Sequence, residues 1–211
     1  MPGRKVPCKH FLQEETEMKI GVLALQGDFA EHQVMLESLG VQVVQVRRAG
    51  QLDGLNGLII PGGESTTFAR LAQAFGLMDT LREFGRQHAI WGTCAGAIFL
   101  SKDIHRPQPV LELMDIVVER NAFGRQVDSF EVDLTVPVLD TVEDGLGVRP
   151  YHAVFIRAPL IEKVAGEAVA LACLPDGRIV AARQGKLLAT SFHPELTSDT
   201  RFHRYFMELA K

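Results

Sequence analysis

The sequence predicts an α/β fold in which a mostly parallel central sheet lies between two layers of helices and is extended by antiparallel strands. The 211-residue chain is long enough to bury a full sheet. Its first half alternates short apolar runs with helical segments, which is typical of parallel strands joined by crossover helices. Its second half has short strand patterns separated by turn signals such as Pro175-Asp176-Gly177, which favour antiparallel pairs.

The elements follow from apolar runs and from the residues that end them. Asp28 and Glu31 have the spacing of a capping box, so the first helix should start at Asp28 and end near Leu39, before Gly40. A second helix is expected near Phe68–Ala74 and a closing helix over about 198–209. The predicted strands are 19–25, 41–46, 57–60, 90–91, 116–119, 127–134, 154–157, 168–171, 179–182 and 187–192.

Residues 1–17 differ from the rest of the chain. They are polar and aperiodic, with Pro2, Pro7 and an acidic cluster at 14–17, and a second methionine, Met18, follows them. We expect residues 1–17 to be a disordered extension or a segment added for expression, with Met18 as a natural start. Residues 18–211 are then expected to form a single domain.

Composition narrows the possible partners. The formal net charge of -4 offers no basic face for nucleic acid, and no apolar run approaches the ~18 residues of a membrane span. The three cysteines, Cys8, Cys94 and Cys173, include no C-x-x-C pair, so neither a disulfide framework nor a metal site is expected. A reducing cytoplasm is the expected location, because it keeps a reactive thiol usable.

Gly92-Thr93-Cys94-Ala95-Gly96 is the most informative segment. It follows a buried strand pattern and opens a helix, as in the nucleophile elbow, where glycines relieve crowding around a strained backbone. A thiol at a helix N-terminus is favoured as thiolate by the helix dipole. The alternative is a buried structural cysteine flanked by small residues.

A histidine and a carboxylate follow the last predicted strand, in His193-Pro194-Glu195. Proline biases His193 toward an extended backbone, in which residues two apart point to the same side. His193 and Glu195 should therefore lie side by side, as a base and its orienting acid do beside a nucleophile. The alternative is a solvated pair in a turn.

Gly62 and Gly63 follow a short buried strand pattern and precede a helix. Consecutive glycines let backbone N–H groups face a ligand, as an oxyanion hole requires. The simpler interpretation is an ordinary strand-to-helix loop with Ser65 or Thr66 as the helix N-cap. The two interpretations are compatible.

Six segments together match a known family: Gly21–Gly27, Pro61–Thr66, Gly92–Gly96, Val118–Gln126, Phe155–Pro159 and Ser191–Leu196. In these segments the chain resembles the class I glutamine amidotransferases. Within that class it is most similar to the glutaminase subunits of two-component pyridoxal 5'-phosphate synthases. The segments span nearly the whole chain after residue 17, and the resemblance implies a flavodoxin-like three-layer fold.

The resemblance implies a role for each catalytic position. Cys94 would attack the carboxamide of L-glutamine, His193 would move the proton, and Glu195 would orient His193. Backbone N–H groups of Gly63 and Ala95 would hold the oxyanion.

It also implies a glutamine-binding set. A zwitterionic amino acid needs a carboxylate near its ammonium group and a cation near its carboxylate. For either arginine of this set the alternative is a surface salt bridge. Gln26 and Gly27 lie where the family places contacts to the synthase partner. The implied glutamine-binding residues are Gly62, Gly63, Glu64, Arg120, Ile156 and Arg157.

The implied activity is hydrolysis of L-glutamine to L-glutamate and ammonia, which passes to a separate synthase subunit in a hetero-oligomer. That subunit would make pyridoxal 5'-phosphate from a pentose phosphate and a triose phosphate, so this chain needs no cofactor. The alternatives are a glutaminase subunit serving a different synthase and a non-enzymatic redox or stress-sensing protein. A cysteine peptidase is disfavoured, because nothing indicates an extended peptide groove.

The chain departs from the family pattern at two places. Glu112 occupies a position that is usually glycine, and the segment 141–151 is longer than usual. Both are expected to affect loop conformation and partner contacts rather than the triad.

Overall fold

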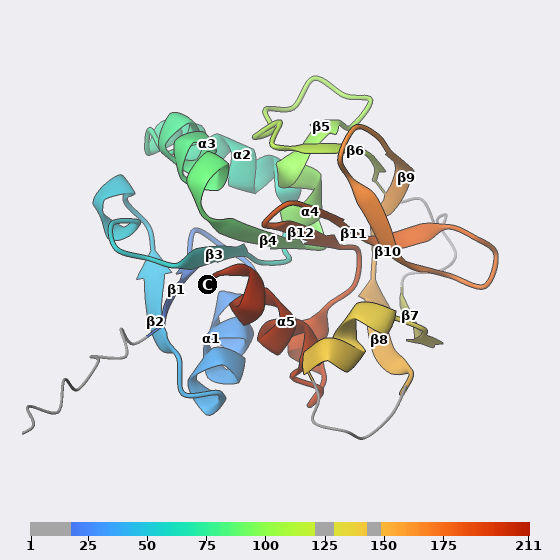
Figure 1. Ribbon diagram of the computed structural model, residues 1–211. Helices are drawn as coiled ribbons and strands as arrows, with labels where there is room; N and C mark the ends of the chain where they lie inside the picture. The colour runs from blue at the N-terminus through green and yellow to red at the C-terminus, as the bar shows by residue number, and fades with distance from the viewer. Residues whose placement is uncertain (1–17, 121–128, 143–148) are drawn as a thin grey trace, which may run out of the picture.

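A mixed β-sheet runs through the molecule and carries helices on both faces (Figure 1). The structure is a computed structural model, and it describes residues 18–120, 129–142 and 149–211. The predicted three-layer α/β architecture is confirmed. The predicted extension 1–17 and most of the long segment 141–151 lie outside the described residues.

Five strands form the parallel half of the sheet. Across the sheet they run in the order β2-β1-β3-β4-β12, and every neighbouring pair is parallel. Because parallel strands end at one edge, the loops after β3, β4 and β12 lie close together. The bounds are β1 (Lys19–Leu23), β2 (Gln42–Val46), β3 (Gly57–Ile60), β4 (Ala89–Thr93) and β12 (Leu187–Thr190).

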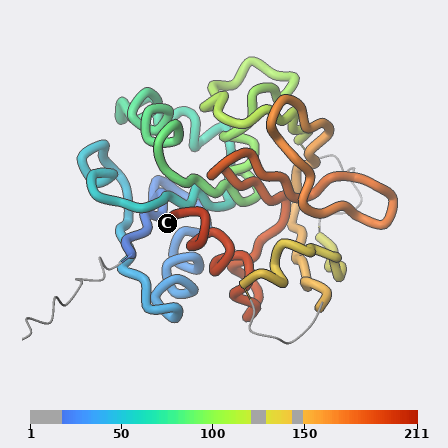
Figure 2. The backbone as a smooth tube through the Cα atoms, viewed as in Figure 1, coloured from blue at the N-terminus to red at the C-terminus, as the bar shows by residue number. Residues whose placement is uncertain are grey.

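The predicted antiparallel extension begins beyond β12. It continues in the order β11-β9-β6-β5, and β10 pairs with β11 from outside this path. The pairs from β12 to β6 and the pair of β10 with β11 are antiparallel, whereas β5 pairs with β6 in parallel. In Figure 2 the red C-terminal part of the chain returns to the middle of the molecule. There β12 pairs with β4, which is green in the figure. The bounds are β5 (Ser101–Asp103), β6 (Met114–Glu119), β9 (Leu160–Val164), β10 (Val169–Cys173) and β11 (Ile179–Gln184).

Helices cover both faces of the sheet (Figure 1). α1 (Phe29–Ser38) and α5 (Arg201–Leu209) lie on one face. α2 (Ser65–Ala74), α3 (Met78–Gln87) and α4 (Ala95–Leu100) lie on the other. None of the helices in the described ranges is long and apolar enough to cross a membrane. Short 3-10 helices occur at η1 (Ala49–Gln51), η2 (Pro137–Val142) and η3 (Pro194–Leu196).

The central strands contribute side chains to two hydrophobic cores, one on each face of the sheet. Leu58, Ile60 and Ile90 pack under α2, α3 and α4, whereas Ile59 and Trp91 pack under α1 and α5. All five side chains are fully buried. Alternation of side chains along a strand sends successive residues to opposite faces, so a strand buried on both faces must be apolar throughout. Each such side chain contributes roughly 1.5–3 kcal/mol.

Several elements differ from the prediction. α3, β5 and β9 were not predicted, and the first strand ends at Leu23 rather than Leu25. β7 (Ser129–Leu134) and β8 (Tyr151–Ile156) do not extend the main sheet but form a separate two-stranded ribbon. Only alternate residues of β8 are buried, and they join the core under α1 and α5, so this ribbon presents one face to the protein and one to solvent.

The predicted capping box of α1 is wrong. Asp28 occupies the N-cap position, but its side chain makes no capping hydrogen bond. Its carboxylate lies instead 3.5 Å from Nδ1 of His193. The local capping signal at Asp28 and Glu31 is therefore overridden by a tertiary contact.

The N-cap of α2 also differs from the prediction. Glu64 takes this position, rather than Ser65 or Thr66, and its Oε2 accepts a hydrogen bond from the Thr67 backbone N–H at 3.1 Å. A glutamate is an uncommon N-cap, but its negative charge is favourable at a helix N-terminus.

The close packing of α4 on β3 yields a stability prediction. A Cβ at Gly96 would lie 2.0 Å from the carbonyl oxygen of Ile60, whereas a Cβ at Gly50 would meet nothing within 4 Å. We expect Gly96→Ala to lower the free energy of unfolding by roughly 2 kcal/mol or more, and Gly50→Ala to change it by less than about 0.5 kcal/mol. Urea denaturation measures both, and equal effects would contradict the close approach.

Candidate active site

Cys94 lies on the sharp turn between β4 and α4. Its backbone has φ 49 and ψ -105, a strained combination for a residue with a side chain. Its N–H donates to the Thr190 carbonyl oxygen at 2.8 Å, which ties the turn to the end of β12. The side chain is 7% exposed. This is the geometry expected of a nucleophile elbow.

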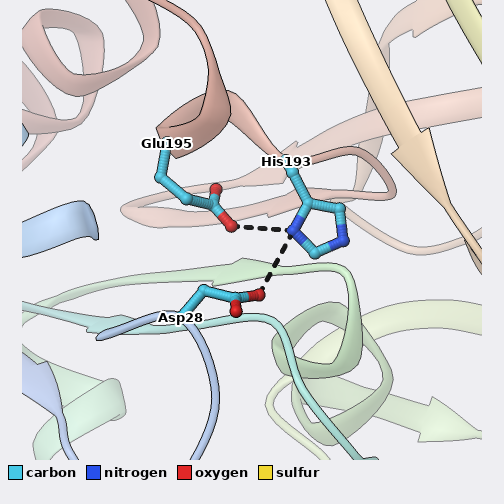
Figure 3. A group of neighbouring side chains, drawn as sticks. All are labelled: Asp28, His193 and Glu195. Atoms are coloured by element: carbon cyan, nitrogen blue, oxygen red, sulfur yellow. Dashed lines mark hydrogen bonds and ion pairs between the residues drawn. The ribbon is translucent and has the colours of Figure 1, made fainter. Parts of the chain in front are cut away.

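His193 lies where the chain leaves β12, and Glu195 follows in the 3-10 helix η3. Nδ1 of His193 is 2.7 Å from Oε1 of Glu195, and the glutamate side chain is fully buried (Figure 3). Asp28 approaches the same Nδ1 at 3.5 Å from the side of α1. The predicted pairing of His193 with Glu195 is therefore present. It is made by a helical turn after Pro194, not by the extended backbone that the sequence suggested.

Charge interactions decide the protonation of His193. Burial lowers the pKa of His193, but interactions with Cys94 and Glu195 outweigh it and raise the pKa to about 10. Burial raises the pKa of Glu195, and His193 opposes that rise. Nε2 of His193 has no regular hydrogen-bond partner among the described residues, so it is available to the Cys94 thiol or to a reacting group. The ring can thus hold a proton opposite a thiolate.

Two further histidines lie behind Glu195. Nε2 of His32 is 3.2 Å from Oε2 of Glu195 and 3.2 Å from Oγ1 of Thr93. Nδ1 of His32 is 3.0 Å from Nε2 of His203. Both rings are fully buried. Burial lowers the pKa of His203 to about 3, and burial together with His203 and His193 lowers the pKa of His32 well below its ordinary value, so both are neutral at pH 7.

The Gly62–Gly63 loop is bonded to the loop after β1. The Asp28 N–H donates to the Gly62 carbonyl oxygen at 3.2 Å. The Gln26 side chain donates to the Glu64 carbonyl oxygen at 3.2 Å and accepts from the Glu64 N–H at 3.3 Å. Because the Gly62 carbonyl points to Asp28, the N–H of Gly63 points to the opposite side of that planar peptide.

Side chains are excluded from both glycines. A Cβ at Gly62 would lie 2.6 Å from Cε1 of His193, and one at Gly63 would lie 2.4 Å from Nε2 of Gln26. Gly63 also has φ 145, a conformation that other residues rarely adopt. Glycine is therefore required at both positions.

A cavity of about 420 Å³ opens at this edge of the sheet. Six residues predicted for the site line it, and the structure adds Ser65, Ile98 and Pro159. The side chain of Ser65 is buried and its Oγ has no hydrogen-bond partner among the described residues. The predicted residues in the lining are Gly63, Glu64, Cys94, Ala95, Arg120 and Arg157.

Opposite charges lie together at the cavity wall. Arg120 donates to Oε1 of Glu64 at 2.9 Å and also to the side chains of Thr66 and Gln108, each at 3.1 Å. Burial raises the pKa of Glu64, but the hydrogen bonds from Thr67 and the charge of Arg120 outweigh it, and the pKa is lowered. The pair offers an anion and a cation side by side, as binding of a zwitterion requires.

Of the other residues predicted to bind glutamine, some line the cavity and some do not. Gly62 lies beneath the His193 ring rather than in the lining. Ile156, at the end of β8, is 41% exposed and does not line it. Arg157 does line it, with φ 44, which is a strained backbone for a non-glycine residue. The segment 121–126 of the matching motifs lies outside the described residues.

Sequence reasoning missed the residues that act through tertiary contacts. His32 and Asp28 belong to the α1 segment and His203 to α5, and none of the three lies within a matching motif. A histidine on a helix carries no local signal of function, so only the fold reveals their link to Glu195. Ser65 was weighed only as a helix cap.

One group among the described residues has donor atoms close enough to share a metal ion, and it is Asp28, His193 and Glu195, within 4.8 Å of one another. Both carboxylates face Nδ1 of His193, and Glu195 already bonds to that atom. The group therefore acts as a hydrogen-bonded set around one ring nitrogen (Figure 3).

The chain belongs to the SNO glutamine amidotransferase family, whose model matches residues 22–211. Pyridoxal 5'-phosphate synthase subunit PdxT of Herpetosiphon aurantiacus is 59% identical over 198 residues, covering 91% of this chain and 100% of the relative. The protein of the same name from Moorella thermoacetica is 55% identical over 194 residues, covering 91% of this chain and 99% of the relative.

Solved structures agree with this family. A crystal structure described as a glutamine amidotransferase superposes with a TM-score of 0.82 at 51% identity and covers 90% of this chain and 98% of its own. The structure of PurLQS from Thermotoga maritima superposes with a TM-score of 0.69 at 14% identity, with 92% of this chain and 100% of the matched chain covered. At that identity the second likeness concerns the fold alone.

The buried histidines predict a pH-dependent stability. The unfolded chain binds a proton at His203 below about pH 6.5, but the folded chain binds it only near a pKa of about 3. The free energy of unfolding should therefore fall as the pH drops from 6.5 toward 3, by roughly 1.4 kcal/mol per pH unit from this residue. In His203→Leu this contribution is absent. Urea denaturation of both proteins at pH 7 and 5.5 measures it, and identical pH slopes would contradict a neutral His203.

Proposed function

We propose that this chain is the glutaminase subunit of a two-subunit pyridoxal 5'-phosphate synthase and that Cys94, His193 and Glu195 are its catalytic triad. The observation that carries the proposal is the buried pair of His193 and Glu195, joined at 2.7 Å, beside the strained elbow of Cys94. Family membership supports the chemistry, and the names of the relatives support the pathway.

The reaction follows from the protonation of this pair. Cys94, as thiolate, attacks the side-chain carboxamide carbon of glutamine while His193 holds the proton that the thiol has lost. The tetrahedral intermediate then breaks its C–N bond, and His193 gives that proton to the leaving ammonia. Water, deprotonated by His193, hydrolyses the remaining thioester to glutamate. Glu195 keeps Nδ1 of the ring protonated, so that Nε2 is the atom that exchanges protons.

Backbone donors would stabilise the oxyanion. Ala95 N–H is the first of α4 and has no intrahelical acceptor, because the helix begins there. The N–H of Gly63, on the side of its peptide away from Asp28, is proposed as the second donor. A single donor of this kind lowers the barrier by roughly 3 kcal/mol.

The glutamine backbone would be held by charge. Glu64 would receive the α-ammonium group, and Arg120 and Arg157 would receive the α-carboxylate at the same cavity. Both Glu64 and Arg120 would exchange part of their mutual ion pair for the substrate. Gly62 and Ile156 are assigned with them from the family resemblance, Gly62 by leaving room beneath His193 and Ile156 from β8.

The remaining assignments follow from this chemistry. Residues 18–211 are proposed to act as one domain, since the family model covers nearly all of them. The ammonia is consumed by a synthase subunit, so the functional unit is a hetero-oligomer and this chain needs no cofactor. A cytoplasmic location is inferred, because a reducing compartment preserves the catalytic thiol.

The alternatives differ in what they require. A redox-sensing protein would need the Cys94 thiol but not the hydrogen-bonded acid behind His193 or the paired Glu64 and Arg120 at the cavity. A glutaminase serving another synthase would have the same site and would differ only in its partner. Purification with the native partner distinguishes this second alternative from the proposed function, because it identifies the synthase.

Replacement of the nucleophile tests the proposal directly. We expect Cys94→Ala, assayed with the synthase subunit present, to lose at least a thousandfold of glutamate formation, because the covalent route is removed. The fold should persist, since alanine is smaller than the side chain it replaces. Cys173→Ala is the matched control, because Cys173 is exposed, and it should keep full activity. Substantial activity in Cys94→Ala would refute the assignment.

The loop contacts predict dependence on the partner. Gln26 and Asp28 bond the Gly62–Gly63 loop, so a partner that contacts Gln26 and Gly27 can reorient the Gly62–Gly63 peptide. A carbonyl at the oxyanion position would repel the developing charge, whereas an N–H would stabilise it. We expect the synthase subunit to raise glutamate formation by about a hundredfold or more. Equal rates with and without it would refute this gating and leave the triad standing.

A further inference from the structure

The buried histidines His32 and His203 have no part in the mechanism above, although they continue its line of contacts. The line runs from His193 through Glu195 to His32 and then to His203, with separations of 2.7, 3.2 and 3.0 Å. The Glu195 side chain is fully buried, as are both rings. In such a buried line of polar atoms, the position of each ring proton decides which atoms are paired by hydrogen bonds.

Neutral rings carry one N–H each, so the protons can be assigned. If His32 carries its proton on Nδ1, its bare Nε2 lone pair faces the Glu195 carboxylate, and His203 is left with a buried Nδ1–H. Nδ1 of His203 has no hydrogen-bond partner among the described residues, so that N–H would be unsatisfied.

The opposite assignment avoids both costs. His203 donates its Nε2–H to Nδ1 of His32, and His32 directs its Nε2–H toward Glu195 and Thr93. Only a lone pair of His203 is then left without a partner. One unpaired lone pair costs less than an unsatisfied N–H together with a lone pair facing a carboxylate, so this is the stable arrangement.

We propose that His32 is a positioning residue for glutaminase chemistry: its Nε2–H fixes the second oxygen of Glu195, and His203 sets the tautomer that makes this possible. The inference rests on the proposed function, since it assigns Glu195 the role of orienting acid. His32 touches neither glutamine nor Cys94 and acts only through Glu195.

The position of His32 explains why Glu195 needs it. Oε2 of Glu195 makes no regular hydrogen bond among the described residues, and Nε2 of His32 lies 3.2 Å from it. The His32 N–H is shared with Oγ1 of Thr93, at the same distance, which holds the ring in place. Without that donor, a buried carboxylate has one oxygen unpaired and is free to rotate away from Nδ1 of His193.

A measurement on the unmodified protein tests the tautomers. In a spectrum of the chain with 15N-labelled histidine at pH 7, both His32 and His203 should have the chemical shifts of neutral rings protonated at Nε2. The His32→Gln and His203→Gln variants identify which signals belong to which ring. An Nδ1-protonated His32 would overturn the proposal, whatever the activity of the protein.

Kinetics of the complex with the synthase subunit test the positioning. We expect His32→Leu to lower kcat for glutamine hydrolysis by about ten- to hundredfold and to change KM by less than about twofold, because the substrate keeps all of its contacts. In His32→Gln the amide N–H can reach the position of Nε2, so most of kcat should return. His88→Leu is the control: His88 follows α3 and stacks on Phe84, and its replacement should leave kcat unchanged.

The pH profile separates positioning from a loss of packing. Glu195 is faced by His193, Asp28 and His32, and removal of the His32 donor destabilises its anion. The acidic limb of the kcat profile should therefore move to higher pH in His32→Leu and return in His32→Gln. A uniform loss without movement of that limb would indicate packing alone and would overturn the proposal.

The failures are distinguishable. If the unmodified complex forms no glutamate, the proposed function is wrong, while the tautomer measurement still decides the hydrogen-bonded line. If the complex is active and His32→Leu keeps the kcat and pH profile of the unmodified chain, the positioning role is wrong. If His32→Leu does not fold, the comparison of His32→Gln with the unmodified protein and the tautomer spectrum decide the outcome.

Discussion

The site depends on the position of β4 between β3 and β12. Parallel pairing on both sides of β4 brings the Gly62–Gly63 loop, the Cys94 turn and His193 to one edge of the sheet. The hydrogen bond from the Cys94 N–H to the Thr190 carbonyl then couples the nucleophile turn to the strand that carries the histidine. Chain segments about a hundred residues apart are thus held at bonding distance by the regular ladder of a sheet, not by flexible loops.

The same arrangement buries the side chains of His193, Glu195, His32 and His203. Burial determines the strength of the electrostatic interactions between them. His193 interacts with Cys94 and with Glu195 in a setting of low dielectric constant, so these interactions outweigh the desolvation of the ring and keep its pKa high. Burial outweighs every opposing contact at His32 and His203, including the contact of His32 with Glu195, so their pKa values are lowered and both rings are neutral. The four buried side chains thus divide into the pair of His193 and Glu195, joined by a hydrogen bond at 2.7 Å, and the neutral pair of His32 and His203 behind it.

The features that could be predicted from the sequence are those encoded by neighbouring residues. The elbow glycines and the buried parallel strands report local geometry, and the structure contains them. His193 and Glu195 also lie side by side as predicted, but through the helical turn η3 rather than an extended backbone. The sequence did not predict the role of Asp28, because the local pattern Asp28-x-x-Glu31 is also the signal for a helix cap, and a contact 165 residues further along decides between the two. Glu112, where the resemblance led us to expect glycine, has φ 59, a conformation that glycine adopts more readily than other residues.

Asp28 and Glu195 both face Nδ1 of His193, and their physical environment decides which of them orients the ring. Glu195 is fully buried at 2.7 Å, whereas the Asp28 side chain is 40% exposed at 3.5 Å. Solvent screens the second interaction, and its longer distance weakens it further, so the orientation of the ring follows Glu195. The same comparison explains the value of a donor behind Glu195: a carboxylate that is buried enough to dominate is also too buried for water to satisfy its other oxygen. Nε2 of His32 lies 3.2 Å from Oε2 of Glu195, close enough to meet that need.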